Sequence, residues 1–246
     1  MKVTQTLPSS LTDRTVVIFG GTSGIGLAAA VQAKAAGAKV IVIGSNAARA
    51  EQAAVDHGLD GWRAADVTDN NAVEVALYDI PEVDHLVLLA GTFVAGTVLA
   101  ADPDYLRRAF DERIWAAISV IRALGDRLSK EGAITFISGS LADRPNAYGT
   151  SVLAAASAAM EALARGLALE LAPVRVNTLS PGPINTPILG KALGEARDSF
   201  VASLEQVLPL HRLGTSEEAG AAAVFLMTNT FMNGAVLNID GGARLV

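Results

Sequence analysis

Near its amino end the chain reads Thr15-Val16-Val17-Ile18-Phe19-Gly20-Gly21-Thr22-Ser23-Gly24-Ile25-Gly26, and Ala-rich sequence follows. The β-branched run predicts a strand, and the glycines predict a turn into a helix. Gly20 would let the chain turn sharply, and Gly24 would remove a Cβ where a pyrophosphate must approach. Gly26 would let the helix pack close to the sheet. The start of that helix would offer free N–H groups to phosphates, so this turn, with Thr22, Ser23 and Ile25, predicts a phosphate cradle.

Six further apolar runs predict six more strands. They are residues 39–43, 61–64, 85–89, 133–137, 174–177 and 235–239. Segments rich in Ala, Leu, Glu and Arg separate most of them and predict helices. Strands that read as continuous apolar runs are buried on both faces, and strand–helix alternation implies parallel crossovers. We therefore expect an α/β fold: one Rossmann-type, doubly wound parallel sheet of about seven strands with helices on both faces.

The chain shows no internal repeat, linker or shift in composition. We therefore expect one domain over residues 1–246, with residues 1–14 as an amino-terminal arm. The longest stretch without a clear pattern runs from Ser180 to about Ser216 and carries Pro181, Pro183, Pro187 and Pro209. Long loops in compact domains are often lids or binding loops, so residues 181–215 are the expected substrate-loop region.

The composition excludes several kinds of site. Hydrophobic residues make up 51% of the 246 residues and aromatic residues 5%, which predicts a large aliphatic core. The chain has no cysteine, and its three histidines lack metal-ligand spacing, so we expect no disulfide, thiolate or metal site. A net charge of −6 without a basic run argues against a nucleic-acid partner. No apolar leader or bilayer-spanning stretch is evident, so we expect a cytoplasmic protein without a membrane partner.

The glycine turn and four later segments resemble the short-chain dehydrogenase/reductase family, over nearly the whole chain. The matching segments are Gly20-x3-Gly24-x-Gly26, Asp66-Val67 after the third strand, Ala90-Gly91 after the fourth, Ser180-Pro181-Gly182-Pro183-Ile184-Asn185-Thr186 with Asn177, and Asn238-Ile239-Asp240-Gly241-Gly242. The family's Asn pair before Ala90 is Leu88-Leu89 here. The resemblance implies an NAD(P) site in which Asp66 and Val67 contact the adenine. It also implies that the segment with Pro181 and Gly182 cradles the nicotinamide, with Ile184 and Thr186 bonding the carboxamide.

The end of the second strand bears on which cofactor binds. NAD-binding folds usually place a carboxylate there for the ribose 2′-OH, but this chain reads Ile43-Gly44-Ser45-Asn46. Without that carboxylate, Ser45, Asn46 and Arg49 would be free to donate hydrogen bonds to a 2′-phosphate. Asn46 is equally well explained as the cap of the next helix. We expect NADP(H) in preference to NAD(H).

Enzymes similar to this chain use a Tyr as proton donor, a Lys that lowers its pKa, and a Ser that orients the carbonyl. Two alignments of this chain to the family's Tyr and Lys positions are possible. Tyr148 fits the Tyr position, but the Lys position then holds Val152 and the following helix needs an insertion. A register without gaps, anchored on Ala158 to Glu170, puts Leu153 at the Tyr position and Ser157 at the Lys position. That register leaves Ser140 at the family's Ser position, and it is the one we favour.

These enzymes also use an Asn that sustains a water relay, and its position holds Arg113 here. A guanidinium directed into the site would polarise a carbonyl or hold an anion. The alternative is a surface Arg paired with Asp111 or Glu112. Tyr148 could still reach the pocket from its loop and act as the acid. The candidate catalytic residues are therefore Ser140, Arg113 and Tyr148. Trp115 is expected to be a buried helix anchor, with a place in the pocket lining as the alternative.

Three functions remain open from the sequence. The first is an atypical NADP(H)-dependent oxidoreductase that interconverts a ketone and a secondary alcohol, with a small apolar substrate because residues 188–212 are mostly Ala, Leu, Gly and Ser. The second is a catalytically silent NAD(P)-binding sensor or partner subunit, which the missing Tyr and Lys favour. The third is an isomerase or lyase, since fold does not fix function. The resemblance also implies a homodimer or homotetramer.

Overall fold

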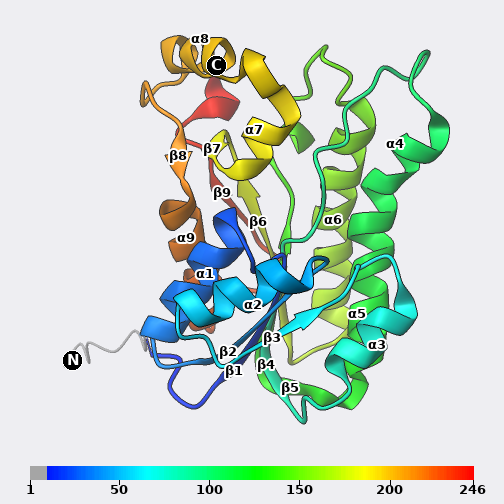
Figure 1. Cartoon of the computed structure of the whole chain (residues 1–246), viewed down its shortest axis with the longest axis vertical. Coiled ribbons are helices and arrows are strands. Elements are labelled where there is room, and N and C mark those ends of the chain that lie inside the picture. Colours follow the sequence, from blue (N-terminus) through cyan, green and yellow to red (C-terminus); the bar gives the residue numbers. More distant parts are fainter. Residues whose placement is uncertain (1–9) are drawn as a thin grey trace.

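Seven parallel strands form the central sheet in the order β3-β2-β1-β4-β5-β6-β9 (Figure 1). They are β1 (Thr15–Phe19), β2 (Lys39–Gly44), β3 (Gly61–Ala64), β4 (Val83–Leu88), β5 (Leu128–Ile137), β6 (Arg175–Pro181) and β9 (Val236–Ile239). The computed structural model describes residues 10–246, so residues 1–9 of the expected amino-terminal arm lie outside it. The seven predicted strands and the Rossmann-type fold are confirmed, although β5 begins earlier than predicted.

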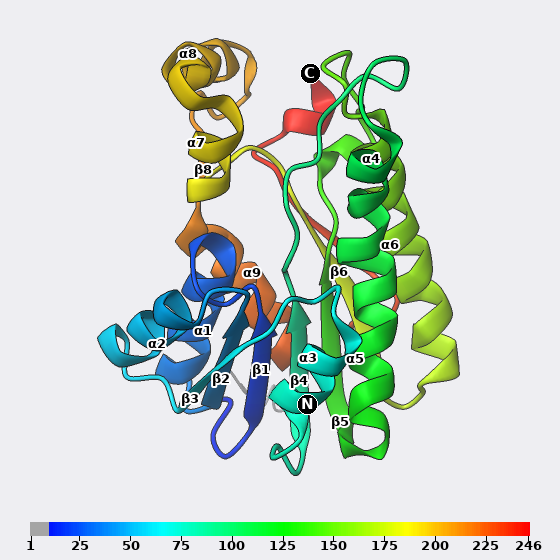
Figure 2. The ribbon, with the colours of Figure 1, turned by 45° about the vertical axis from the view of Figure 1, so that its right-hand side comes forward.

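Helices cover both faces of the sheet (Figure 2). One face carries α1 (Gly24–Ala35), α2 (Ala47–Asp56) and α9 (Ser216–Thr228), and the other carries α3 (Asn70–Leu77), α5 (Ala116–Leu124) and α6 (Ser151–Glu170). The inner strands β1, β4 and β6 are buried on both sides, while the edge strands β3 and β9 are only partly buried. Along β1, Val17 and Phe19 join one apolar cluster and Val16 and Ile18 the other, all 0% exposed. This two-sided burial explains why the strands read as unbroken apolar runs.

Helix α4 (Pro103–Phe110) continues into α5 through a wider π-helical turn, Asp111–Trp115. The helix α4 packs on α6, where Leu106 and Ala109 meet Ala156. Turns of this kind often occur at functional sites because they rotate the side chains that follow. Here the turn carries Arg113.

The expectation of an irregular stretch from Ser180 to Ser216 is wrong. This segment contains β7 (Ile184–Asn185), α7 (Pro187–Leu193), α8 (Arg197–Val207) and β8 (Gly214–Thr215). Its prolines mark boundaries: Pro187 is the first residue of α7, where its missing N–H costs nothing, and Pro209 follows α8. Figure 2 shows α7 and α8 standing above the carboxyl ends of the strands.

Helix α6 also corrects an expectation. By length and composition alone, its 20 residues (Ser151–Glu170) suffice to cross a membrane. In the fold this helix packs on β5, β6 and α4, and Met160, Ala164 and Ala168 belong to the core. The apolar residues of α6 are therefore explained by its packing against the sheet and α4.

The strand order reverses at β1. The chain first adds β2 and β3 on one side of β1, and then adds β4 and the later strands on the other side. In open parallel sheets such a switch point leaves a crevice outside the carboxyl ends of the two central strands, and ligands bind there. The fold thus places a candidate site at Gly20 after β1 and Ala90 after β4.

Candidate functional site

A cavity of about 890 Å³ opens at this switch point. Most of the predicted cofactor residues line it: Gly20, Thr22, Ser23, Gly24, Ile25, Gly26, Ser45, Arg49, Asp66, Val67, Ala90, Gly91 and Thr186. Asn46, Pro181, Gly182 and Ile184 are not among the described lining residues. The cavity therefore brings together side chains from the ends of β1, β2, β3 and β4.

The glycine turn needs glycine at two positions for steric reasons. Gly20 has φ +79°, and a Cβ there would lie 2.8 Å from the Ala90 nitrogen. A Cβ on Gly26 would lie 2.1 Å from the Gly20 carbonyl oxygen. These contacts let α1 begin directly against the sheet, as predicted, and they bring the turn against the end of β4.

The start of α1 is open toward the cavity. Asn46, Asp69, Asp102 and Thr215 cap α2, α3, α4 and α9 with their side chains, but Ser23 makes no such bond to α1. The first N–H groups of a helix need an acceptor, and they carry the positive end of its dipole. Because Gly24, Ile25 and Gly26 line the cavity, these groups fit an anionic phosphate there.

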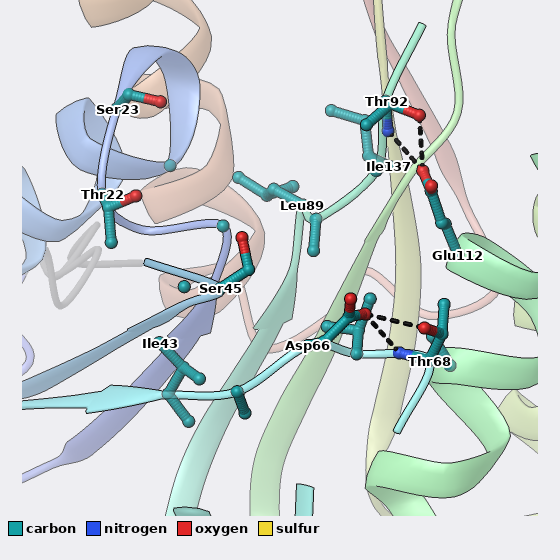
Figure 3. Close-up of a pocket in the computed structure, with 18 of the residues that line it drawn as sticks. Thr22, Ser23, Ile43, Ser45, Asp66, Thr68, Leu89, Thr92, Glu112 and Ile137 are labelled. Carbon is teal, nitrogen blue, oxygen red and sulfur yellow. Dashed lines mark hydrogen bonds between the residues drawn. The ribbon is translucent and has the colours of Figure 1, made fainter. Parts of the chain in front are cut away.

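At the end of β2, Ser45 and Arg49 line the cavity. Asn46 instead caps α2, its side-chain oxygen accepting from the Arg49 N–H at 2.8 Å. The cap interpretation of Asn46 is thus confirmed, and its proposed cofactor contact is not supported. At the end of β3, the Asp66 carboxylate accepts from the amide (2.9 Å) and hydroxyl (2.8 Å) of Thr68 (Figure 3). These two hydrogen bonds hold Asp66 in a fixed turn beside the cavity.

One wall comes from a helix face that the sequence analysis missed. It consists of Arg108, Asp111, Glu112, Trp115, Ala116 and Ser119. The spacing of three and four residues was visible in the sequence, but polar residues at this spacing usually face solvent. Trp115 is 61% exposed, so the expected buried anchor is wrong, and the alternative that it lines the pocket is confirmed.

Glu112 is the most buried charged group of this wall, at 7% exposure. Its Oε1 accepts from the Nε and Nη2 of Arg108 at 3.0 and 2.6 Å. Its Oε2 accepts from the amide and hydroxyl of Thr92 at 2.6 and 2.8 Å (Figure 3). The carboxylate therefore ties α4 to the loop that follows β4.

Arg113 follows neither predicted arrangement. Its guanidinium is half-buried and donates to the carbonyls of Thr92 (3.0 Å) and Ala109 (3.3 Å). It lies behind Gly91, where a Cβ would be 3.3 Å from Cζ. Burial lowers the pKa of the guanidinium, and the nearby charge of Glu112 opposes that shift. Arg113 is thus a cation immediately behind the cavity wall, neither on the surface nor directly inside the cavity.

The other two catalytic candidates lie outside the cavity lining. Tyr148 is 78% exposed on the loop before α6. Ser140 begins a short 3-10 turn after β5, and neither residue is among the described lining residues. Helix α6 contains no Tyr and no Lys, and Leu153 and Ser157 are both 4% exposed. Ser138 donates to Glu161 at 2.7 Å, so it has a side-chain partner.

The segment expected to hold the nicotinamide contributes only in part. Thr186, Pro187, Ile188 and Lys191 line the cavity from the start of α7. Ile184 is 8% exposed, and Gly182 packs so closely on Asp240 that a Cβ would lie 2.7 Å from it. These two residues are not among the described lining residues of the cavity. No group of three or more possible metal ligands occurs in residues 10–246.

The comparisons with known proteins agree with this site. The sequence profile of a family described as "Enoyl-(Acyl carrier protein) reductase" matches residues 20–244. Short-chain dehydrogenase/reductase ATR9 of Stachybotrys chlorohalonatus is 33% identical over 94% of this chain and 97% of its own length. Cis-2,3-dihydrobiphenyl-2,3-diol dehydrogenase of Pseudomonas putida is 33% identical over 94% of this chain and 91% of its own.

Among solved structures, that of a small-chain dehydrogenase in complex with NADPH superposes with a TM-score of 0.82. It shares 31% identity and covers 95% of this chain and 100% of its own. The glycine turn, the strand order and these similarities agree along almost the entire length. The chain belongs to the short-chain dehydrogenase/reductase family of nicotinamide-dependent oxidoreductases.

Proposed function

We propose that this protein is an NADP(H)-dependent oxidoreductase that interconverts a small apolar ketone and a secondary alcohol. The observation that carries the proposal is the cavity at the β1/β4 switch point, with its open helix start and with Ser45 and Arg49 at the end of β2. The cofactor, when bound, supplies the hydride chemistry. The protein supplies binding, orientation and electrostatics.

The residues present fit such a cofactor. The start of α1 would hold the pyrophosphate, and Asp66 and Val67 would border the adenine. Ser45 and Arg49 would hold a 2′-phosphate, since no carboxylate ends β2 to repel it. Thr186 would hold the carboxamide end, with Ile188 and Lys191 beside it on α7.

We further propose that the chain is atypical in lacking the family's Tyr and Lys. Helix α6 offers Leu153 and Ser157 instead, and neither side chain can donate a proton as an acidified phenol does. Arg113, behind Gly91, would stabilise negative charge that develops on the substrate oxygen. Ser140 follows β5 outside the described cavity lining, so it would have to turn toward the cavity to orient that oxygen. Tyr148 would have to move with its loop to act as the acid, and otherwise water would donate the proton.

A side-by-side fluorescence titration with NADPH and NADH tests the cofactor assignment. Wild type should bind NADPH more tightly. Ser45→Asp restores a carboxylate at the end of β2 and should weaken NADPH by about tenfold or more through charge repulsion, with less effect on NADH. Ser203→Asp adds the same charge on the exposed face of α8 and serves as the control. Tighter NADH binding by wild type would refute the NADP(H) preference.

A catalytically silent NAD(P)-binding protein is the second candidate, favoured by the exposure of Tyr148 and the absence of Tyr and Lys from α6. Consumption of NADPH with a panel of carbonyls separates the two. Turnover that falls in Arg113→Ala and Ser140→Ala supports the enzyme. Tight NADPH binding with no turnover across the panel supports the silent protein.

A further inference from the structure

We propose that Glu112 is a positioning residue that fixes the cavity wall at Gly91 and Thr92 and, through Thr92, the Arg113 guanidinium. The inference rests on the proposed function in that this wall would border the cofactor. It concerns a buried carboxylate for which neither the family resemblance nor the fold provides a role.

The two oxygens of Glu112 are fully used. Arg108 donates two hydrogen bonds to Oε1, and Thr92 donates two to Oε2. A carboxylate that accepts four hydrogen bonds has no free lone pair directed at a substrate. Glu112 is therefore suited to hold a structure in place, and poorly suited to move a proton.

The backbone of Thr92 is held on both its N–H side and its carbonyl side. The Thr92 N–H donates to Glu112, and the Thr92 carbonyl accepts from Arg113. Glu112 and Arg113 are consecutive in the π-helical turn Asp111–Trp115, so a single turn of helix holds the Thr92 backbone at two points. The segment after β4 has no regular structure of its own until α4, so these bonds decide where its first residues lie.

Burying the charge of Glu112 costs free energy, which its hydrogen bonds and ion pair must offset. A carboxylate at 7% exposure loses most of its hydration, and that loss is tolerated only when it is paired and hydrogen-bonded. Arg108 provides the pairing while remaining half exposed at the rim. Only an acceptor-only side chain satisfies donors on both sides, since a glutamine would direct its own NH₂ at either Arg108 or Thr92. This requirement makes Glu112→Gln an informative substitution of nearly the same size.

The first experiment measures amide hydrogen exchange in residues 89–101 without cofactor, in wild type and Glu112→Gln. We expect the Thr92 amide to exchange about tenfold faster in the variant, because its charged acceptor is lost. Amides in β1 and β4 should keep wild-type rates. Asp104→Asn removes an exposed carboxylate from α4, where it forms an ion pair with Arg107, and should leave the Thr92 rate unchanged. Unchanged exchange at Thr92, or a rise that is equal throughout the sheet, would overturn the proposal.

The second experiment measures the NADPH dissociation constant of the same variants. Glu112→Gln should raise it about fivefold to tenfold, on the scale of one hydrogen bond to a charged group. Thr92→Val should weaken binding, and Thr92→Ser, which keeps the hydroxyl, should restore it. Faster local exchange with unchanged affinity would overturn the link to the cofactor wall. If wild type binds no NADPH, the proposed function fails, while the exchange experiment still decides the role of Glu112.

Discussion

The substitution Gly26→Ala tests the glycine turn most directly. A Cβ at this position would lie 2.1 Å from the Gly20 oxygen and 2.8 Å from its carbonyl carbon. Ordinary contact starts near 3.4 Å, so α1 must move by about 1 Å or more to accept the methyl group. Both atoms belong to the backbone of the turn, and no side chain can rotate away to make room.

Two opposing terms set the size of the effect. Overpacking costs about 1–3 kcal/mol, and this case belongs at the upper end because backbone must move. Alanine gains about 1 kcal/mol over glycine in a helix. We therefore expect a net destabilisation of about 2 kcal/mol. For a domain of this size that corresponds to a fall in Tm of roughly 4–8 °C.

The assay pairs thermal unfolding with NADPH titration. Gly166→Ala is the matched control, because a Cβ there meets nothing within 4 Å on the exposed face of α6. That variant should be stabilised by about 0.5–1 kcal/mol and should bind NADPH as wild type does. Gly26→Ala should melt earlier and bind NADPH more weakly, since the start of α1 is displaced. Wild-type stability together with wild-type affinity in Gly26→Ala would refute the steric argument.

Two further predictions concern buried ionisable side chains near the amino ends of the strands. Arg175 is 7% exposed and donates to the carbonyls of Leu226, Met227 and Asn229 at 2.7–2.9 Å, at the carboxyl end of α9. Arg175→Met should therefore lower the free energy of unfolding by about 2–4 kcal/mol in urea titration, and a loss below 0.5 kcal/mol would show that water replaces the guanidinium. Burial lowers the pKa of His85 from 6.5 to about 4, and the positive charge of Arg175 is the second contribution to this shift. Because the unfolded chain binds the proton more readily, stability should fall as pH drops from about 6.5 toward 4, and His85→Gln should remove that slope. An unchanged slope in the variant would assign the pH dependence to other groups.

The sequence by itself determined the strands, the sheet type and the tight glycine turn that lines the cavity. Each depends on local causes: unbroken apolar runs such as Thr15 to Phe19 are buried on both faces, and a turn that must pass close to its neighbours needs glycine at Gly20 and Gly26. The same local logic predicted the cavity positions of Ser45, Arg49 and Asp66. It also left Asn46 open between cap and ligand, and the structure shows the capping bond from the Arg49 amide.

Only the tertiary structure showed which residues of α4 and the following turn form a wall of the cavity, and where the catalytic candidates lie relative to it. Glu112 and Arg108 look like an ordinary surface pair four residues apart, and their role depends on Thr92, which is distant in the sequence. Tyr148 and Arg113 were both catalytic candidates from the sequence, yet Tyr148 is exposed on a loop and Arg113 lies behind Gly91. The prolines between Ser180 and Ser216 suggested a loop, but they mark the ends of β6 and α8 and the start of α7. The positions of these residues depend on which segments of the chain pack against one another. Local sequence patterns do not contain that information.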